Sequence, residues 1–309
     1  MTITHQTALP VRVLAWLNQR FGPAPILLYL LLYLTGMLFT QIVAKHESTS
    51  LRPLHWVPFL AIFGYFLLVR VLDEHKDYAK DCVNYPERIL QRGLVTLDHL
   101  KVVGILALVP QVVISLVVDG GFGAATAWWL VLMAWTALMT KEFFVGDWLE
   151  PRLALYAVLH IVAGPIALVW TAALTADGHR LPWSIGWLAA LPVFVGLGLE
   201  VGRKLQAPDD ERPTVASYTR QFGVKGAAIA LSLMTIGAAA VVAGMLSAAD
   251  VDAPAALVVL ALTVLAAVGA AARFAVAPTR ANVQSVETVG AVAMLAILVT
   301  AIVTLYIGG

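Results

Sequence analysis

Nine apolar segments recur along the chain, and they constrain its fold more than any other feature of the sequence. Each contains about 20 mainly apolar residues, which is the length that a helix needs to cross the hydrocarbon core of a bilayer. The sequence therefore predicts an all-α polytopic membrane protein in which one transmembrane domain covers residues 1–309. The expected spans are 26–44, 55–72, 99–118, 123–141, 153–176, 182–202, 223–248, 254–276 and 287–307.

The composition agrees with this prediction. Hydrophobic residues make up 60% of the chain and charged residues 13%, whereas a soluble domain has about half and about a quarter. The net charge of +1 gives no electrostatic basis for binding nucleic acid. Cys82 is the only cysteine, which excludes an intrachain disulfide and a cysteine-based metal site.

Residues 1–25 precede the first span and form an N-terminal interfacial segment. Within them, "PVRVLAWLNQRFG" places apolar residues at helical spacing, with Arg12 and Arg20 among them. This pattern predicts a short helix that lies on the membrane surface.

The distribution of Lys and Arg predicts how the chain is oriented. The N-terminus and the segments after spans 2, 4, 6 and 8 contain 17 of the 20 basic residues; the others are Lys45, Arg52 and Arg180. Because basic residues gather on the cytoplasmic side, we expect a cytoplasmic N-terminus and an external C-terminus. The expected location is a bacterial inner membrane.

The segment 70–93, "RVLDEHKDYAKDCVNYPERILQRG", carries ten charged residues among its 24. If the second span continues as a helix, Asp73, Asp77 and Asp81 form one acidic stripe, because residues four apart lie on the same face. Mg²⁺ typically binds one or two carboxylates together with substrate phosphates. A solvated charged loop is the alternative, but the regular spacing favours a metal site.

Two arginines follow this stripe. Arg88 and Arg92 have guanidinium groups that bind phosphate oxygens in a bidentate manner. Carboxylates, a metal and arginines together predict a diphosphate site at the membrane boundary. A lipid diphosphate fits, with its head at the charged mouth and its tail between the spans.

These residues resemble the UbiA superfamily of intramembrane prenyltransferases. Its members have nine transmembrane helices and two Asp-rich motifs on cytoplasmic loops after helices 2 and 6. The first motif, Asn or Asp followed by Asp at +4 and +8, matches Asp73, Asp77 and Asp81. The family's Arg-Pro-Leu-x-x-Gly segment is "RILQRG" here, with Ile89 in place of proline. The resemblance covers nearly the whole chain in topology, and its motifs are specific over 70–93.

The second motif departs from the family pattern. Glu200 and Lys204, in "LEVGRKLQAPDDER", stand where many members have Asp-x-x-x-Asp. Under one interpretation, Glu200 binds a second Mg²⁺ while Arg203 and Lys204 hold phosphate. Under the other, the metal ligands are the acids that follow Pro208, namely Asp209, Asp210 and Glu211.

The resemblance implies an enzyme that uses two or more Mg²⁺ ions to ionise an isoprenoid diphosphate within the bilayer. A prenyltransferase then alkylates a hydrophobic or aromatic acceptor, and this is the favoured function. The alternative function is a UbiA-type terpene cyclase, and the divergent second motif is the feature that supports it. The expected catalytic acids are Asp73, Asp77 and Asp81. The expected diphosphate-binding residues are Lys76, Arg88, Arg92, Arg203 and Lys204.

Two further residues are candidates for the site. Glu142 lies in a charged segment on the same side as both motifs, although aromatic neighbours there also indicate interfacial anchoring. His160 lies within the fifth span, where an ionisable residue is a functional candidate. The alternative for His160 is pairing with a neighbouring helix.

Two other classes of protein fit the sequence less well. Transporter sites usually lie near the bilayer midplane, whereas the acidic residues here gather at span ends. The CDP-alcohol phosphotransferases also repeat Asp at four-residue spacing. They need a preceding Asp-Gly-x-x-Ala-Arg, which this chain lacks.

Overall fold

The computed structural model describes residues 3–212 and 215–309, and every regular element in these residues is a helix. The α-helices are α1 (Leu9–Phe21), α2 (Pro23–Val43), α3 (Val57–Asn84), α4 (Leu97–Asp119), α5 (Ala124–Thr140), α6 (Gly146–Leu149), α7 (Leu153–Ile161), α8 (Ala163–Thr175), α9 (Ile185–Arg203), α10 (Tyr218–Ala248), α11 (Pro254–Val276) and α12 (Arg280–Gly308). Short 3-10 helices, η1 (Pro53–Trp56), η2 (Glu142–Phe144) and η3 (Pro208–Asp210), lie in the links.

Eight helical segments of the described chain are long and apolar enough to cross a membrane, so the chain is an integral membrane protein. They correspond to eight of the predicted spans, with α7 and α8 together forming the segment Leu153–Thr175. The remaining predicted span, 123–141, corresponds to α5, an apolar helix of 17 residues. Because that length is at the lower limit for crossing a bilayer, nine crossings stay a prediction.

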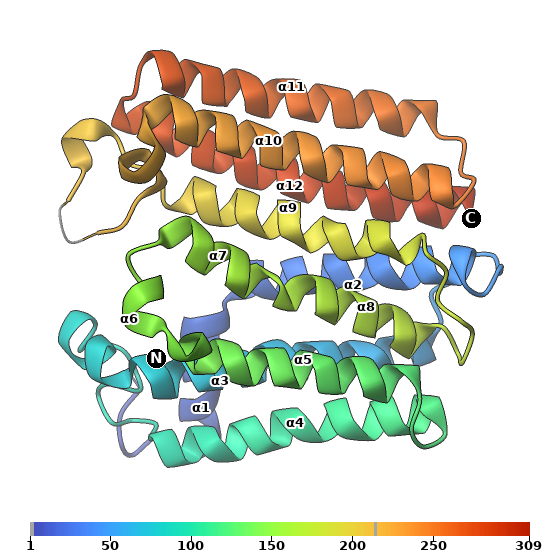
Figure 1. Ribbon diagram of the computed structural model, residues 1–309. Helices are drawn as coiled ribbons and strands as arrows, with labels where there is room; N and C mark the ends of the chain where they lie inside the picture. The colour runs from blue at the N-terminus through green and yellow to red at the C-terminus, as the bar shows by residue number, and fades with distance from the viewer. Residues whose placement is uncertain (1–2, 213–214) are drawn as a thin grey trace.

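The long helices run side by side in one bundle (Figure 1). Helices α10, α11 and α12 lie on one side and α3, α4 and α5 on the other, with α2, α8 and α9 between them. The two chain termini lie at opposite ends of the bundle. Helices α3 and α9 both end at the end that holds the N-terminus, which we call the motif end. The two charged segments therefore lie close to one another.

Helices α3 and α4 approach closely at a glycine. A Cβ atom on Gly64 would lie 2.5 Å from the carbonyl oxygen of Ala107, so only glycine fits there. Close contact at small residues is the usual means by which membrane helices gain packing energy. This contact fixes the part of α3 that leads into the first motif.

Helix α1 forms as predicted and packs one face onto the link between α3 and α4. Trp16 is fully buried there among Leu90, Leu94 and Val95, while Leu14 on another face of the helix is exposed. A guanidinium nitrogen of Arg12 donates to the Leu94 carbonyl oxygen at 2.7 Å. The N-terminal helix is therefore part of the motif end and packs beside the C-terminal end of α3.

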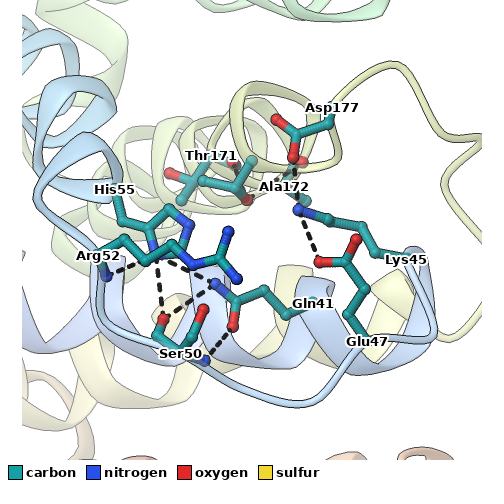
Figure 2. A network of polar contacts seen from close by, with 10 residues as sticks. Gln41, Lys45, Glu47, Ser50, Arg52, His55, Thr171, Ala172 and Asp177 are labelled. Atoms are coloured by element: carbon teal, nitrogen blue, oxygen red, sulfur yellow. Dashed lines mark hydrogen bonds and ion pairs between the residues drawn. The ribbon is translucent and has the colours of Figure 1, made fainter.

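At the opposite end of the bundle, a polar network ties two links together (Figure 2). The Gln41 side chain accepts from the Ser50 amide at 2.8 Å and donates to the Ser50 carbonyl at 3.2 Å. Lys45 pairs with Glu47 at 3.1 Å and with Asp177 of the link between α8 and α9. These contacts fasten the link after α2 to the link between α8 and α9.

Candidate functional site

Helix α3 continues to Asn84, well beyond its apolar part, so the predicted continuation is confirmed. Asp73, Asp77 and Asp81 consequently lie on a helix rather than on a loop. Their four-residue spacing directs them along one side of α3 at the motif end.

Asp81 is held by two arginines from different parts of the chain. Arg88, which follows α3, donates to its carboxylate at 2.9 Å. Arg20 of α1 approaches the same oxygen to 3.9 Å. The Arg88 guanidinium also lies over the Tyr85 ring, 3.5 Å from its centroid. Both contacts fix the orientation of Arg88, which does not itself line the polar cavity described below but contacts Asp81, which does.

The other two acids of the motif have different surroundings. Asp73 lies 3.7 Å from a guanidinium nitrogen of Arg70 and lines a small hollow with Lys76 and His160. Asp77 makes no salt bridge with any residue that the structure describes. The negative charges of the acidic stripe are therefore compensated unevenly, since Asp73 and Asp81 form ion pairs and Asp77 does not. Asp77 is the carboxylate that a ligand can approach without breaking an ion pair.

A polar cavity of about 850 Å³ opens at the motif end. Asp77 and Asp81 line it from α3, and Lys204 lines it from the end of α9. The structure thus brings the two charged segments to one cavity. The lining also includes Lys76, Lys80, Asn84, Tyr85, Lys141, Glu142, Asp147, Glu150 and Tyr156.

Asp77 and Asp81 are the candidate ligands for Mg²⁺ in this cavity. Among residues 3–212 and 215–309, no three His, Cys, Asp or Glu side chains gather closely enough to hold a metal ion by themselves. Asp77 and Asp81 nevertheless supply oxygen ligands to one cavity. Mg²⁺ is usually bound by one or two carboxylates and completed by substrate phosphates. These residues fit an ion shared with a diphosphate better than an all-protein cage.

The residues of the second motif are joined to one another. Glu200 pairs with Arg203 at 2.6 Å and with Lys204 at 2.7 Å. Lys204 lines the polar cavity, whereas Glu200 and Arg203 line a second cavity described below. The end of α9 therefore lies between the two cavities.

The alternative acids of the second segment lie apart from the polar cavity. Asp209 and Asp210 are exposed in η3 and do not line it. Glu211 accepts hydrogen bonds from the hydroxyls of Ser217 and Thr219, both at 2.6 Å. These hydrogen bonds of Glu211 stabilise the link before α10.

The second cavity is an apolar groove of about 620 Å³ between α2, α9 and α12. Leucines such as Leu28, Leu199 and Leu298 form much of its lining, and Glu200 and Arg203 are its charged lining residues. An amphiphile could therefore place its chain in the groove and its charged head near the end of α9.

The link after α5 contains an unusual backbone. Glu142, Phe143 and Phe144 all have left-handed φ angles, of 50°, 54° and 60°. A non-glycine residue in this region costs about 1–3 kcal/mol, so the turn needs contacts that hold it. One of them is the Phe143 ring, which packs edge-on against Trp135 at 5.3 Å.

Glu142 provides the polar part of these contacts. Its carboxylate accepts from the Lys76 ammonium group at 2.9 Å and from the Tyr156 hydroxyl at 3.3 Å. Burial raises the pKa of Glu142, but the hydrogen bond and charge of Lys76 outweigh burial and leave that pKa below its usual value. Glu142 is therefore an anion at neutral pH.

His160 lies beside this group. Its ring stacks on Tyr156 with centroids 4.0 Å apart, and its Nδ1 lies 2.8 Å from the Tyr156 carbonyl oxygen. The other ring nitrogen, Nε2, is buried without a hydrogen-bond partner among the described residues. The fifth predicted span is broken just beyond it, between α7 and α8.

Sequence reasoning placed Arg92 in the site and did not include Arg20. Arg92 donates to the Ile3 carbonyl at 3.4 Å and does not line the polar cavity. Arg20 instead forms a salt bridge with Glu74, whose side chain is only 1% exposed. Glu74 is 54 residues from Arg20 along the chain, so no local pattern could have indicated their contact.

Comparison with known proteins adds one finding on the fold. No protein-family model and no curated protein matches the sequence. Among solved structures, the chain is similar to a digeranylgeranylglyceryl phosphate synthase in membranes, with a TM-score of 0.65 over 96% of this chain and 99% of that one. The two sequences are 15% identical. At this identity the likeness shows a shared fold.

Proposed function

We propose that this chain is a Mg²⁺-dependent intramembrane prenyltransferase, a divergent relative of the UbiA superfamily. One observation carries the proposal: Asp77 and Lys204, from charged segments far apart in sequence, line one polar cavity beside an apolar groove. The fold shared with a digeranylgeranylglyceryl phosphate synthase supports the same chemistry. The substrates are an isoprenoid diphosphate and a hydrophobic or aromatic acceptor.

The two cavities suit the two ends of such a substrate. The diphosphate occupies the polar cavity near Asp77, Arg88 and Lys204, and the prenyl chain follows the end of α9 into the apolar groove. Both cavities have the size of ordinary small-molecule sites, about 300–1,000 Å³.

The reaction breaks the bond between the prenyl C1 and the diphosphate oxygen, and both electrons leave with the oxygen. An electron pair of the acceptor then bonds to the allylic cation, and the acceptor loses a proton. Arg88 and Lys204 offset the negative charge of the departing diphosphate, and the apolar walls keep water from the cation. Mg²⁺, held by Asp77 and Asp81, would supply further charge stabilisation.

The direct test uses purified protein, Mg²⁺ and prenyl diphosphates of 10 to 20 carbons. Adding an aromatic acid or a glyceryl phosphate as acceptor should yield a prenylated product and diphosphate. Cyclic hydrocarbons or terpene alcohols formed without an acceptor would instead support the terpene cyclase. If no diphosphate is released under any of these conditions, the proposed function is wrong.

For the orientation, we propose that the motif end faces the cytoplasm of a bacterium and that the C-terminus lies outside the inner membrane. In a Cys82→Ala background, Tyr78→Cys and Asp210→Cys should react with an impermeant thiol reagent from the same side. His179→Cys, in the link between α8 and α9, is the control and should react from the opposite side. Labelling of positions 78 and 210 from different sides would contradict this topology.

Two substitutions separate the roles proposed for the second motif. Lys204→Ala should raise the KM for the prenyl diphosphate about tenfold, because a charge-assisted hydrogen bond to phosphate is lost. Glu200→Gln should instead raise the Mg²⁺ concentration needed for half-maximal rate several-fold.

The same two residues could act only as a helical ion pair, which is worth about 0.2–0.5 kcal/mol. Both variants would then keep wild-type kinetics and lose only that small stability. Initial rates measured against substrate and against Mg²⁺ distinguish the outcomes. Unchanged kinetics in both would exclude Glu200 and Lys204 from the site.

A further inference from the structure

The Glu142 carboxylate occupies an anion site inside the polar cavity. Lys76 and Tyr156 both donate to it, and the Lys76 ammonium group also lies 3.3 Å from the Tyr156 hydroxyl oxygen. These three side chains line the cavity in which we place the diphosphate. An ammonium group and a hydroxyl that converge on a carboxylate oxygen can equally bind a phosphate oxygen.

This arrangement places the charge of Lys76 against a carboxylate of the protein itself. The lysine and glutamate side chains are 23% and 25% exposed, so water screens their pair only in part. While the pair persists, the charge of Lys76 is neutralised by the protein itself. A diphosphate meets the uncompensated charge of Lys76 only if Glu142 moves away.

The backbone around Glu142 favours such a movement. Glu142, Phe143 and Phe144 hold consecutive left-handed φ angles without a glycine among them. Phe144 is largely exposed, so its side chain does not anchor the turn, and the packing of Phe143 on Trp135 is the aromatic contact that holds it. If the contacts with Lys76 and Tyr156 are lost, the turn can relax toward ordinary φ angles.

We propose that Glu142 is a displaceable carboxylate that holds the anion site formed by Lys76 and Tyr156 until the diphosphate arrives. The terminal phosphate replaces the carboxylate, and the Glu142–Phe144 turn moves out of the cavity. This inference rests on the proposed function, and it adds a step in which the protein exchanges its own anion for the substrate's.

The inference predicts an unusual result for a substitution inside a binding site. Glu142→Gln removes the competing charge, so it should strengthen diphosphate binding about three- to tenfold, the size expected for a charge-assisted contact. A metal-binding role for Glu142 would give the opposite sign. A purely structural role would lower thermal stability and leave the affinity unchanged.

The experiment is calorimetric titration of the detergent-purified full chain with inorganic pyrophosphate and Mg²⁺. Asp98→Asn is the control, because it also removes one negative charge and breaks an ion pair, the exposed one with Lys101, but Asp98 does not line the cavity. We expect it to change affinity less than twofold. Adding Lys76→Met to Glu142→Gln should cancel the gain.

Glu142→Ala serves as a second variant if Glu142→Gln does not fold, and thermal melting in detergent checks each protein. The inference is supported if pyrophosphate binds only to the glutamine or alanine variant, or if it binds to that variant more tightly than to the wild type. Equal or weaker binding to both overturns it, while turnover of prenyl diphosphates by the wild type would leave the proposed function standing. If no variant binds pyrophosphate and the wild type turns over no prenyl diphosphate, both the inference and the proposed function are wrong.

Discussion

Asp77→Ala should slow the turnover of prenyl diphosphates at least about 100-fold, the size of effect seen when one charge-stabilising group is removed from an active site. Asp77 lines the polar cavity and makes no salt bridge with a described residue, so its loss breaks no contact that holds the fold. Thermal stability should stay the same or rise slightly, because Asp73 loses a neighbour of like charge.

Steady-state rates across a Mg²⁺ series, together with melting curves, measure both effects. Asp98→Ala is a suitable control, since Asp98 is an exposed acid at the start of α4 whose only salt bridge among the described residues is to Lys101. It should keep the wild-type rate within about twofold, as surface substitutions usually do. Near-normal Mg²⁺-dependent rates in both Asp77→Ala and Asp73→Ala would refute the proposed diphosphate site.

Arg20→Ala should destabilise the protein by about 3–5 kcal/mol, the usual result of leaving a buried charge without its partner. Glu74 is almost fully buried, and its second carboxylate oxygen has no hydrogen-bond partner among the described residues. Arg20 is therefore the group that compensates its charge. The same arginine also approaches Asp81, so its loss should reduce turnover as well.

Unfolding in mixed detergent micelles gives the free energy of unfolding for each variant. Arg12→Ala is the matched control in the same helix, because Arg12 donates to a backbone carbonyl and should cost about 1 kcal/mol. Combining Arg20→Ala with Glu74→Gln should recover much of the stability, since the uncompensated charge is then gone. If Arg20→Ala lowers the free energy of unfolding no more than Arg12→Ala does, Arg20 does not compensate the charge of Glu74.

The helices could be predicted from the sequence because their signal is local. A run of about 20 apolar residues is sufficient to indicate a membrane helix, and the expected boundaries of α2, α4 and α11 lie within a few residues of the observed ones. The sequence carries a signal for the break between α7 and α8, because Pro165 cannot donate to the carbonyl of Ile161 and its ring clashes with it. The apolar run nevertheless continues through the break without a charged residue, so it predicts a single span.

The site was predictable only to the level of the helix face. Four-residue spacing placed Asp73, Asp77 and Asp81 on one side of α3, but the partner of Asp81 in α1 comes from a distant part of the chain. The left-handed turn at Glu142 was equally hidden, because no glycine or asparagine marks it. Its contacts with Lys76 and Tyr156 exist only once three helical segments have packed.

The packing of α1 on the link between α3 and α4 also determines the order in which the protein can be assembled. The partners of Trp16, which extend to Leu100, are synthesised about 80 residues after the helix itself. At about 5–20 residues per second, α1 waits roughly 4–16 s before its docking surface has left the ribosome. During this interval its amphipathic face can rest on the bilayer surface. The first helix to be made can therefore dock only after α3 and the link to α4 have been synthesised, and Arg20 meets Glu74 and Asp81 only once these acids are in place.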